Sequence, residues 1–232
     1  MAIRRVLVTA ISFLLLSFTA VSPTSISHAD TPQVATGDSP EFAAGGGHAC
    51  AIKRDGSVVC WGGNWAGQTN VPAQIGRATQ VTAGSGHTCA LNSEGKVFCW
   101  GLNTSGQTNV PSDLGNIIQI SAGGDHNCAL NESGNVSCWG INSAGQINPP
   151  NNMGRVSAIS AGGNHTCAIN SEGKVFCWGY NYQGTTDVPG NLGTTVQIAG
   201  RGPCALSNQG QLTCWGSNQH GDKEIPSSLK KS

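Results

Sequence analysis

Ten cysteines are the residues of this chain whose type and spacing most directly predict chemistry. They form five pairs, and the two members of each pair enclose nine residues. Cysteines at short spacings bind zinc, whereas paired cysteines of exported chains oxidise to disulfides. No Cys-x-x-Cys motif occurs, so we expect disulfides rather than a metal site. The predicted disulfides are Cys50–Cys60, Cys89–Cys99, Cys128–Cys138, Cys167–Cys177 and Cys204–Cys214.

Four histidines share a Gly-x-x-His pattern and are the second group able to do chemistry. A ring of imidazoles is typical of metal binding or acid–base catalysis. Equivalent positions on separate repeats are spread around an axis, however, and each imidazole can be satisfied locally by backbone groups. We therefore expect a structural role for His48, His87, His126 and His165.

The remaining polar residues form no recognisable catalytic arrangement. Glu94, Glu132 and Glu172 lie in predicted hairpin turns, where solvated polar residues are expected. No Gly-x-Ser-x-Gly motif, phosphate-binding loop or carboxylate pair is present in the sequence. The sequence therefore predicts neither an enzyme nor a cofactor.

The cysteines belong to a cassette that occurs five times. Each copy starts Cys-Ala, contains a glycine-bearing turn and ends Cys-Trp-Gly-x-Asn. Successive copies are 39 residues apart three times and then 37 residues apart. A fixed period in this range predicts a propeller or a solenoid, in which each unit buries its apolar face against its neighbours.

The pattern of each repeat predicts four short antiparallel strands. In the second repeat these are 78–84, 88–91, 96–101 and 106–111, the last ended by proline. The sequence therefore predicts an all-β protein, a β-propeller built from five roughly 39-residue, four-stranded repeats. A β-solenoid is the alternative fold.

The turn between the second and third strands sets the register of the cysteines. A three-residue loop with Gly95 in the left-handed conformation makes Asn92 face Lys96. Cys89 and Cys99 then face each other, with Cα atoms about 4.5 Å apart.

The tryptophan after each second cysteine points to the opposite side of its strand. We expect this column to pack between adjacent repeats, with ligand-stacking platforms as the alternative.

The N-terminus resembles an export signal, with two arginines, an apolar run and a small-x-small cleavage site. We predict a signal peptide at 1–29, a disordered leader at 30–40, the propeller at 41–226 and a tail at 227–232. An uncleaved anchor is the alternative, but the run is shorter than the roughly 20 residues that span a bilayer. We thus expect a secreted or periplasmic protein without stable membrane insertion.

The charge balance excludes one class of partner. Removing the signal takes away two arginines and no acids, so the net charge falls from zero to about −2. Such a chain offers no general attraction to phosphate backbones, and nucleic acid is not an expected partner.

Binding specificity is expected where the repeats differ. The first and third connections of a repeat leave on the same face, and loop residues on a rigid framework carry recognition. Exposed aromatic side chains and an arginine are typical of an interface. The candidate binding residues are Trp65, Leu102, Asp125, Ile141, Tyr180, Tyr182 and Arg201, with Ser85, Asn164 and His220 also variable.

The segment AGSGHTCALNSEGKVFCWGLNTSGQTNVP at 83–111 resembles the regulator of chromosome condensation repeat family. This resemblance implies a β-propeller, usually with seven blades. Five repeats are present, so we expect a closed five-blade ring, with an incomplete larger propeller as the alternative. The chain is also distantly similar to the propeller-type β-lactamase inhibitory proteins. Their loop aromatics are replaced here by pairs such as Gly46-Gly47 and Ser85-Gly86, so that inhibitory surface does not carry over.

The function expected from the sequence is that of a secreted, non-enzymatic propeller that binds an extracellular or periplasmic protein. The alternatives are a glycan-binding module and an inhibitor of a secreted enzyme such as a β-lactamase. Equivalent aromatic pockets would favour glycans, but the loop residues differ between the copies, which favours one extended protein site.

Overall fold

The computed structural model describes residues 41–218, 221 and 223–226. The predicted signal peptide, leader and tail, together with His220, lie outside these residues. In the described part of the chain, no helix has the length and apolar character to cross a bilayer.

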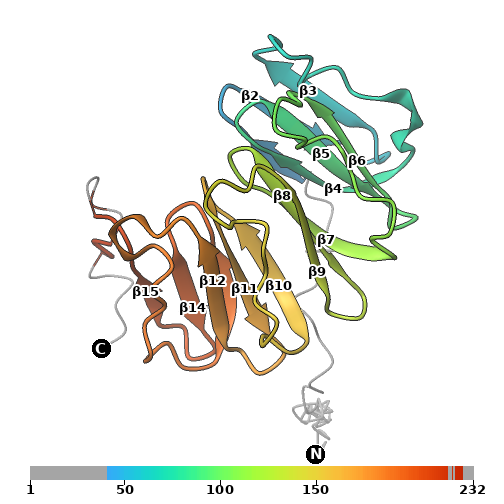
Figure 1. Ribbon diagram of the computed structural model, residues 1–232. Coiled ribbons are helices and arrows are strands. Elements are labelled where there is room, and N and C mark those ends of the chain that lie inside the picture. Colours follow the sequence, from blue (N-terminus) through green and yellow to red (C-terminus); the bar gives the residue numbers. More distant parts are fainter. Residues whose placement is uncertain (1–40, 219–220, 222, 227–232) are drawn as a thin grey trace, which may run out of the picture. The chain divides into compact units, whose positions relative to one another are not determined.

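Five antiparallel sheets follow one another along the chain, one for each repeat (Figure 1). Two 3-10 helices, η1 (Ala73–Ile75) and η2 (Tyr182–Gly184), lie in connections. The strands are β1 (Phe42–Ala44), β2 (His48–Ile52), β3 (Val58–Gly62), β4 (Ala78–Ala83), β5 (His87–Asn92), β6 (Val97–Gly101), β7 (Ile117–Ala122), β8 (His126–Asn131), β9 (Val136–Gly140), β10 (Val156–Ala161), β11 (His165–Asn170), β12 (Val175–Gly179), β13 (Thr195–Ala199), β14 (Cys204–Ser207) and β15 (Leu212–Cys214).

The hairpin between β5 and β6 has the predicted register. Cys89 pairs with Cys99, and the Asn92 N–H donates to the Lys96 carbonyl at 3.0 Å. Gly95 takes a φ of 74°, in the left-handed region that glycine favours. The Asn92 carboxamide oxygen also accepts hydrogen bonds from the N–H groups of Glu94 and Lys96. The side chain of Asn92 thus fixes the turn, and the turn fixes which cysteines meet.

The five predicted cysteine pairs are present as disulfides. Each disulfide joins residues directly opposite each other on neighbouring strands, with Cα atoms 4.0–4.1 Å apart. None of the ten cysteines is free. The bonds are Cys50–Cys60, Cys89–Cys99, Cys128–Cys138, Cys167–Cys177 and Cys204–Cys214.

The prediction of a fourth strand is wrong, because the sheets have three strands each. The segment 106–111 is instead held in turns by its own loop. The Asn109 N–H donates to the Gly106 carbonyl at 3.0 Å. The Asn103 side chain accepts from the Thr108 N–H and donates to Asn109. Local side-chain bonds therefore compete successfully with strand pairing here.

Neighbouring sheets pack through four hydrophobic clusters, one between each consecutive pair of repeats. Each cluster contains the tryptophan of the later repeat, as the packing hypothesis predicted. Trp100, for example, is buried against Ile52 and Ile75 of the first repeat. Its indole N–H donates to the Gln68 carbonyl at 2.9 Å.

We call the first strand of each sheet its inner strand; these strands are β1, β4, β7, β10 and β13. They line one cavity of about 450 Å³, which is the arrangement of propeller blades. The expected closed ring is not observed. No hydrophobic cluster of the described residues joins the first sheet to the fifth. Trp61 of the first repeat is 54% exposed, whereas its four equivalents are 6–7% exposed. The blades therefore form a propeller in which the first and last blades do not cover each other.

Candidate binding face

The first and third connections of the repeats lie side by side, as predicted. The backbone N–H of Leu102 donates to the Gly86 carbonyl at 2.9 Å. The same bond recurs between Ile141 and Asp125, and between Tyr180 and Asn164, each at 2.9 Å. The variable residues of both connections are therefore presented on one face by a repeated backbone geometry.

Trp65 and Leu102 are brought together over Gly86, although they come from different repeats. A Cβ atom at Gly86 would lie 2.6 Å from the Trp65 ring and 3.3 Å from the Leu102 Cβ. The absence of a side chain at Gly86 thus lets the indole lie close against the next repeat. Trp65 nevertheless remains 68% exposed.

Tyr180 and Tyr182 form a stacked pair, with ring centroids 6.1 Å apart and planes 2° from parallel. The Thr185 hydroxyl donates to the carbonyls of both tyrosines, at 3.1 and 2.9 Å. The two rings are 51% and 48% exposed. This loop therefore holds two aromatic rings in a fixed relation at the surface.

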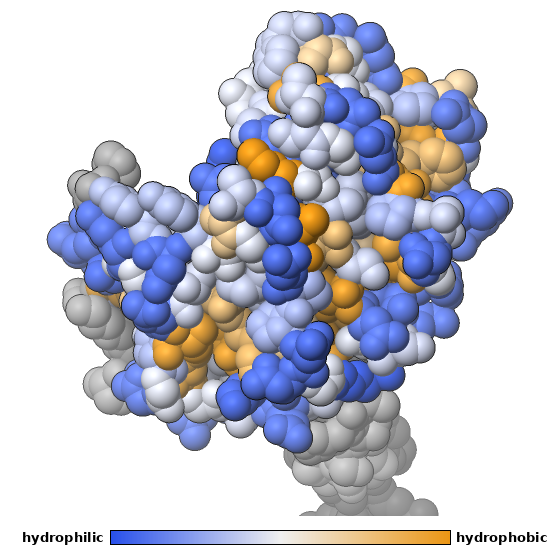
Figure 2. All heavy atoms as spheres, in the orientation of Figure 1, coloured by the Kyte–Doolittle hydropathy of each residue, from blue (hydrophilic) through white to orange (hydrophobic). Residues whose placement is uncertain are grey.

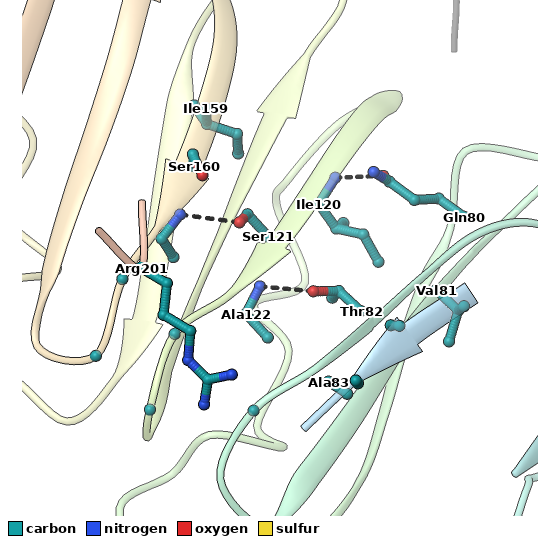
Figure 3. A pocket seen from close by; sticks show the side chains of 18 of the residues that line it. Gln80, Val81, Thr82, Ala83, Ile120, Ser121, Ala122, Ile159, Ser160 and Arg201 are labelled. Carbon is teal, nitrogen blue, oxygen red and sulfur yellow. Dashed lines mark hydrogen bonds between the residues drawn. The ribbon is translucent and has the colours of Figure 1, made fainter. Parts of the chain in front are cut away.

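Arg201 lines the central cavity, in the first connection of the fifth repeat. Figure 3 shows its guanidinium extending away from the labelled side chains of the hydrogen-bonded pairs Gln80–Ile120 and Thr82–Ala122. No described residue pairs with the Arg201 side chain. Asp125, by contrast, accepts a hydrogen bond from the Gln107 carboxamide at 3.3 Å. Neither Arg201 nor Asp125 forms an ion pair with a described residue.

The surface seen in Figure 2 is mostly hydrophilic, with apolar residues in separate patches. Leu102, Asp125 and Ile141 are only partly exposed, whereas Trp65, Tyr180 and Tyr182 are exposed. Ser85 and Asn164 are exposed on the same connections.

The histidines are structural, but their partners were not those expected. The His48 Nε2 lies 2.8 Å from the Thr88 hydroxyl of the next repeat, rather than against local backbone. Thr88 in turn donates to the Gln68 carbonyl, which also accepts from Trp100. The sequence contains a signal for this link, because the second, third and fourth repeats each have a polar residue directly before the first cysteine. These residues are Thr88, Asn127 and Thr166. The corresponding pairs are His87–Asn127 and His126–Thr166, each at 2.9 Å.

Burial keeps these imidazoles neutral. Desolvation lowers the pKa of His126 to about 4, with the neighbouring His165 and His87 as smaller causes. Desolvation also lowers the pKa of His48, His87 and His165. Among the residues that the structure describes, no group of three or more His, Cys, Asp or Glu side chains could hold a metal ion.

Comparison with known proteins agrees with this architecture. A family model, the regulator of chromosome condensation (RCC1) repeat, matches residues 41–68, 78–107, 117–146 and 156–185. No curated protein matched the chain.

Three solved structures illustrate the likeness. Human WBSCR16 is 24% identical, with a TM-score of 0.68, over 82% of this chain and 64% of that one. The Arabidopsis thaliana receptor kinase ACR4 ectodomain is 26% identical, with a TM-score of 0.63, over 76% of this chain and 71% of that one. Prp20p of Saccharomyces cerevisiae is 23% identical, with a TM-score of 0.67, over 81% of this chain and 59% of that one. The chain thus spans less than two thirds of the length of WBSCR16 and Prp20p.

Proposed function

Because this chain belongs to the regulator of chromosome condensation repeat family, we propose that it is an exported, non-enzymatic propeller that binds another protein through the face described above. The observation that carries this proposal is the exposure of Trp65, Tyr180 and Tyr182 on one face. Most other aromatic positions of the repeats serve the packing between blades. Exposed, fixed aromatic rings are typical anchors of protein interfaces.

The charge on this face narrows the kind of partner. Arg201 presents an unpaired guanidinium at the cavity that the inner strands line. An acidic side chain or a C-terminal carboxylate of the partner would pair with it bidentately. The partner surface therefore combines apolar pockets for the aromatic rings with a carboxylate that enters the cavity.

Two further observations support export and a protein partner. Five disulfides are typical of chains that fold in an oxidising compartment. ACR4 supplies this fold as a receptor ectodomain, and Prp20p is described with its binding to Gsp1p and histones. In those two proteins, the fold therefore forms a receptor ectodomain or belongs to a protein that binds other proteins.

The test uses the folded chain as bait in extracts and culture medium, with captured proteins quantified by mass spectrometry. We expect Trp65→Ala with Tyr182→Ala to abolish capture of the specific partner, and Arg201→Ala to weaken it about tenfold or more. Ile118→Ala with Val196→Ala is the matched control, because both side chains are 45% exposed but lie on strands β7 and β13.

Equal capture by the wild-type chain and the Trp65/Tyr182 double variant would rule out this face. Binding to a glycan array that is lost in the same double variant would instead assign the face to sugars. The melting temperature of each variant must match that of the wild-type chain, because Trp65 also packs on Gly86.

A further inference from the structure

The first repeat leaves one half of the inter-blade interface uncovered. In the later repeats, the tryptophan is buried against the preceding blade, and the apolar residue of the inner strand is buried there or, at Ile198, partly buried. In the first repeat these positions are Trp61, which is 54% exposed, and Phe42, which is 74% exposed. Val59, on the same strand as Trp61, is 44% exposed. We call Phe42, Val59 and Trp61 the first-blade face.

The fifth repeat leaves the other half uncovered. Gln80 and Gln119 each accept a hydrogen bond from the inner strand of the following blade. The fifth repeat carries Gln197 at this position, where the side chain is exposed and bonds to no described residue. Ala199 beside it is also exposed, although its equivalent Ser121 bonds the following blade. We call Gln197, Ala199 and the half-exposed Leu206 the fifth-blade face.

The two uncovered faces also match each other in what they lack. The histidine of each of blades one to three forms a hydrogen bond with a Thr or Asn side chain of the next blade. The first repeat has Ala49 in that Thr or Asn position, so it offers no partner to such a histidine. The fifth repeat has no histidine in the column, and therefore needs none. A histidine-bearing blade on the first-blade face would lack the Thr or Asn partner that His48, His87 and His126 each have.

We propose that the fifth-blade face of one copy binds the first-blade face of a second copy, so that the chain associates head to tail. The contact would continue the inter-blade interface that already occurs four times within the chain. The carboxamide of Gln197 would accept from the Phe42 N–H of the second copy, as Gln80 accepts from Ile120 at 2.7 Å. Trp61 would become buried like its equivalents. Such a heterologous contact leaves one free face at each end and so allows longer oligomers.

The experiment measures the mass of the full, non-reduced chain by light scattering and sedimentation over a range of concentrations. We expect concentration-dependent dimers and larger species for the wild-type chain. Trp61→Arg and Ala199→Arg each block one face at an exposed position, so each variant alone should remain monomeric. An equimolar mixture should form a dimer and nothing larger, because each variant keeps one intact and complementary face.

Three results would overturn the proposal. The wild-type chain could remain monomeric with an exposed Trp61, as judged by fluorescence quenching. It could remain monomeric with Trp61 protected, which would mean that the first and fifth blades close within one chain. Alternatively, the Trp61→Arg variant could still self-associate, which would place the contact elsewhere. Ser93→Arg, at an exposed position in the hairpin turn after β5, is the control for the added charge.

Discussion

The side chain of Gln119 in β7 pairs with both backbone groups of Ile159 in β10. Its Nε2 donates to the Ile159 carbonyl at 3.0 Å, and its Oε1 accepts from the Ile159 N–H at 3.0 Å. Inner strands of neighbouring blades belong to different sheets and share no ladder. A carboxamide therefore replaces backbone pairing at this contact between the third and fourth blades.

Gln119→Met tests this link. The substitution preserves the length of the side chain but leaves the N–H and carbonyl of Ile159 without these bonds. We expect the free energy of unfolding to fall by about 1–3 kcal/mol in chemical denaturation. Gln197→Met is the control and should change it by less than about 0.5 kcal/mol at dilutions where the chain is monomeric. Equal effects would show that the link contributes nothing.

Thr88→Val tests the histidine link between blades. Valine matches the shape of threonine but cannot bond His48 or the Gln68 carbonyl, so buried polar groups lose their partner. The expected destabilisation is about 1–3 kcal/mol, measured by thermal or urea unfolding. The matched control is Thr104→Val, because Thr104 is exposed on the loop after β6. An unchanged melting temperature for Thr88→Val would contradict the assignment.

The buried histidines predict acid sensitivity. Their pKa values are lowered in the folded state, to about 4 for His126, from an ordinary value of 6.5. The unfolded chain therefore binds more protons below pH 6.5, and stability is lost as the pH falls from about 6.5 towards 4. Each histidine contributes at most about 1.4 kcal/mol per pH unit in this range. Unfolding curves at pH 7.5, 6 and 5 measure the effect, and His126→Gln should reduce the slope.

The disulfides predict a specific peptide map and a specific loss on removal. Proteolysis without reduction should give five linkages, each within one hairpin and none between repeats. Replacing Cys89 and Cys99 together by serine should lower the free energy of unfolding by about 3 kcal/mol, because the unfolded chain gains freedom. A linkage between two repeats would refute the register.

Features that depend on neighbours along the chain were predictable. The turn at Asn92 to Lys96 decides the strand register, and the register decides that Cys89 meets Cys99. The repetition of the pattern predicted blades that pack through their tryptophans. The absence of the predicted fourth strand could not be foreseen from alternation alone, because it depends on the Asn103 side chain, which accepts a hydrogen bond from the N–H of Thr108. A segment with strand-like residues became a loop.

The candidate site was predictable to a similar extent. Both variable connections lie on one face, as the alternation of strand directions requires. That Trp65 lies over Gly86, and that Tyr180 and Tyr182 stack, depended on loop conformations that no repeat pattern specifies. The partner of His48 lies 40 residues further along the chain, beyond the reach of local reasoning.

The sequence by itself determined the blades, because hairpin turns and cysteine spacing act over about ten residues and are the same in every repeat. Tertiary structure alone decided how the blades meet and where they stop meeting. Burial of Trp61 and Phe42 requires a surface that the pattern cannot supply, and the expected ring is left open there. Closure depends on the angle between successive blades, which is set by the packing of side chains from different repeats.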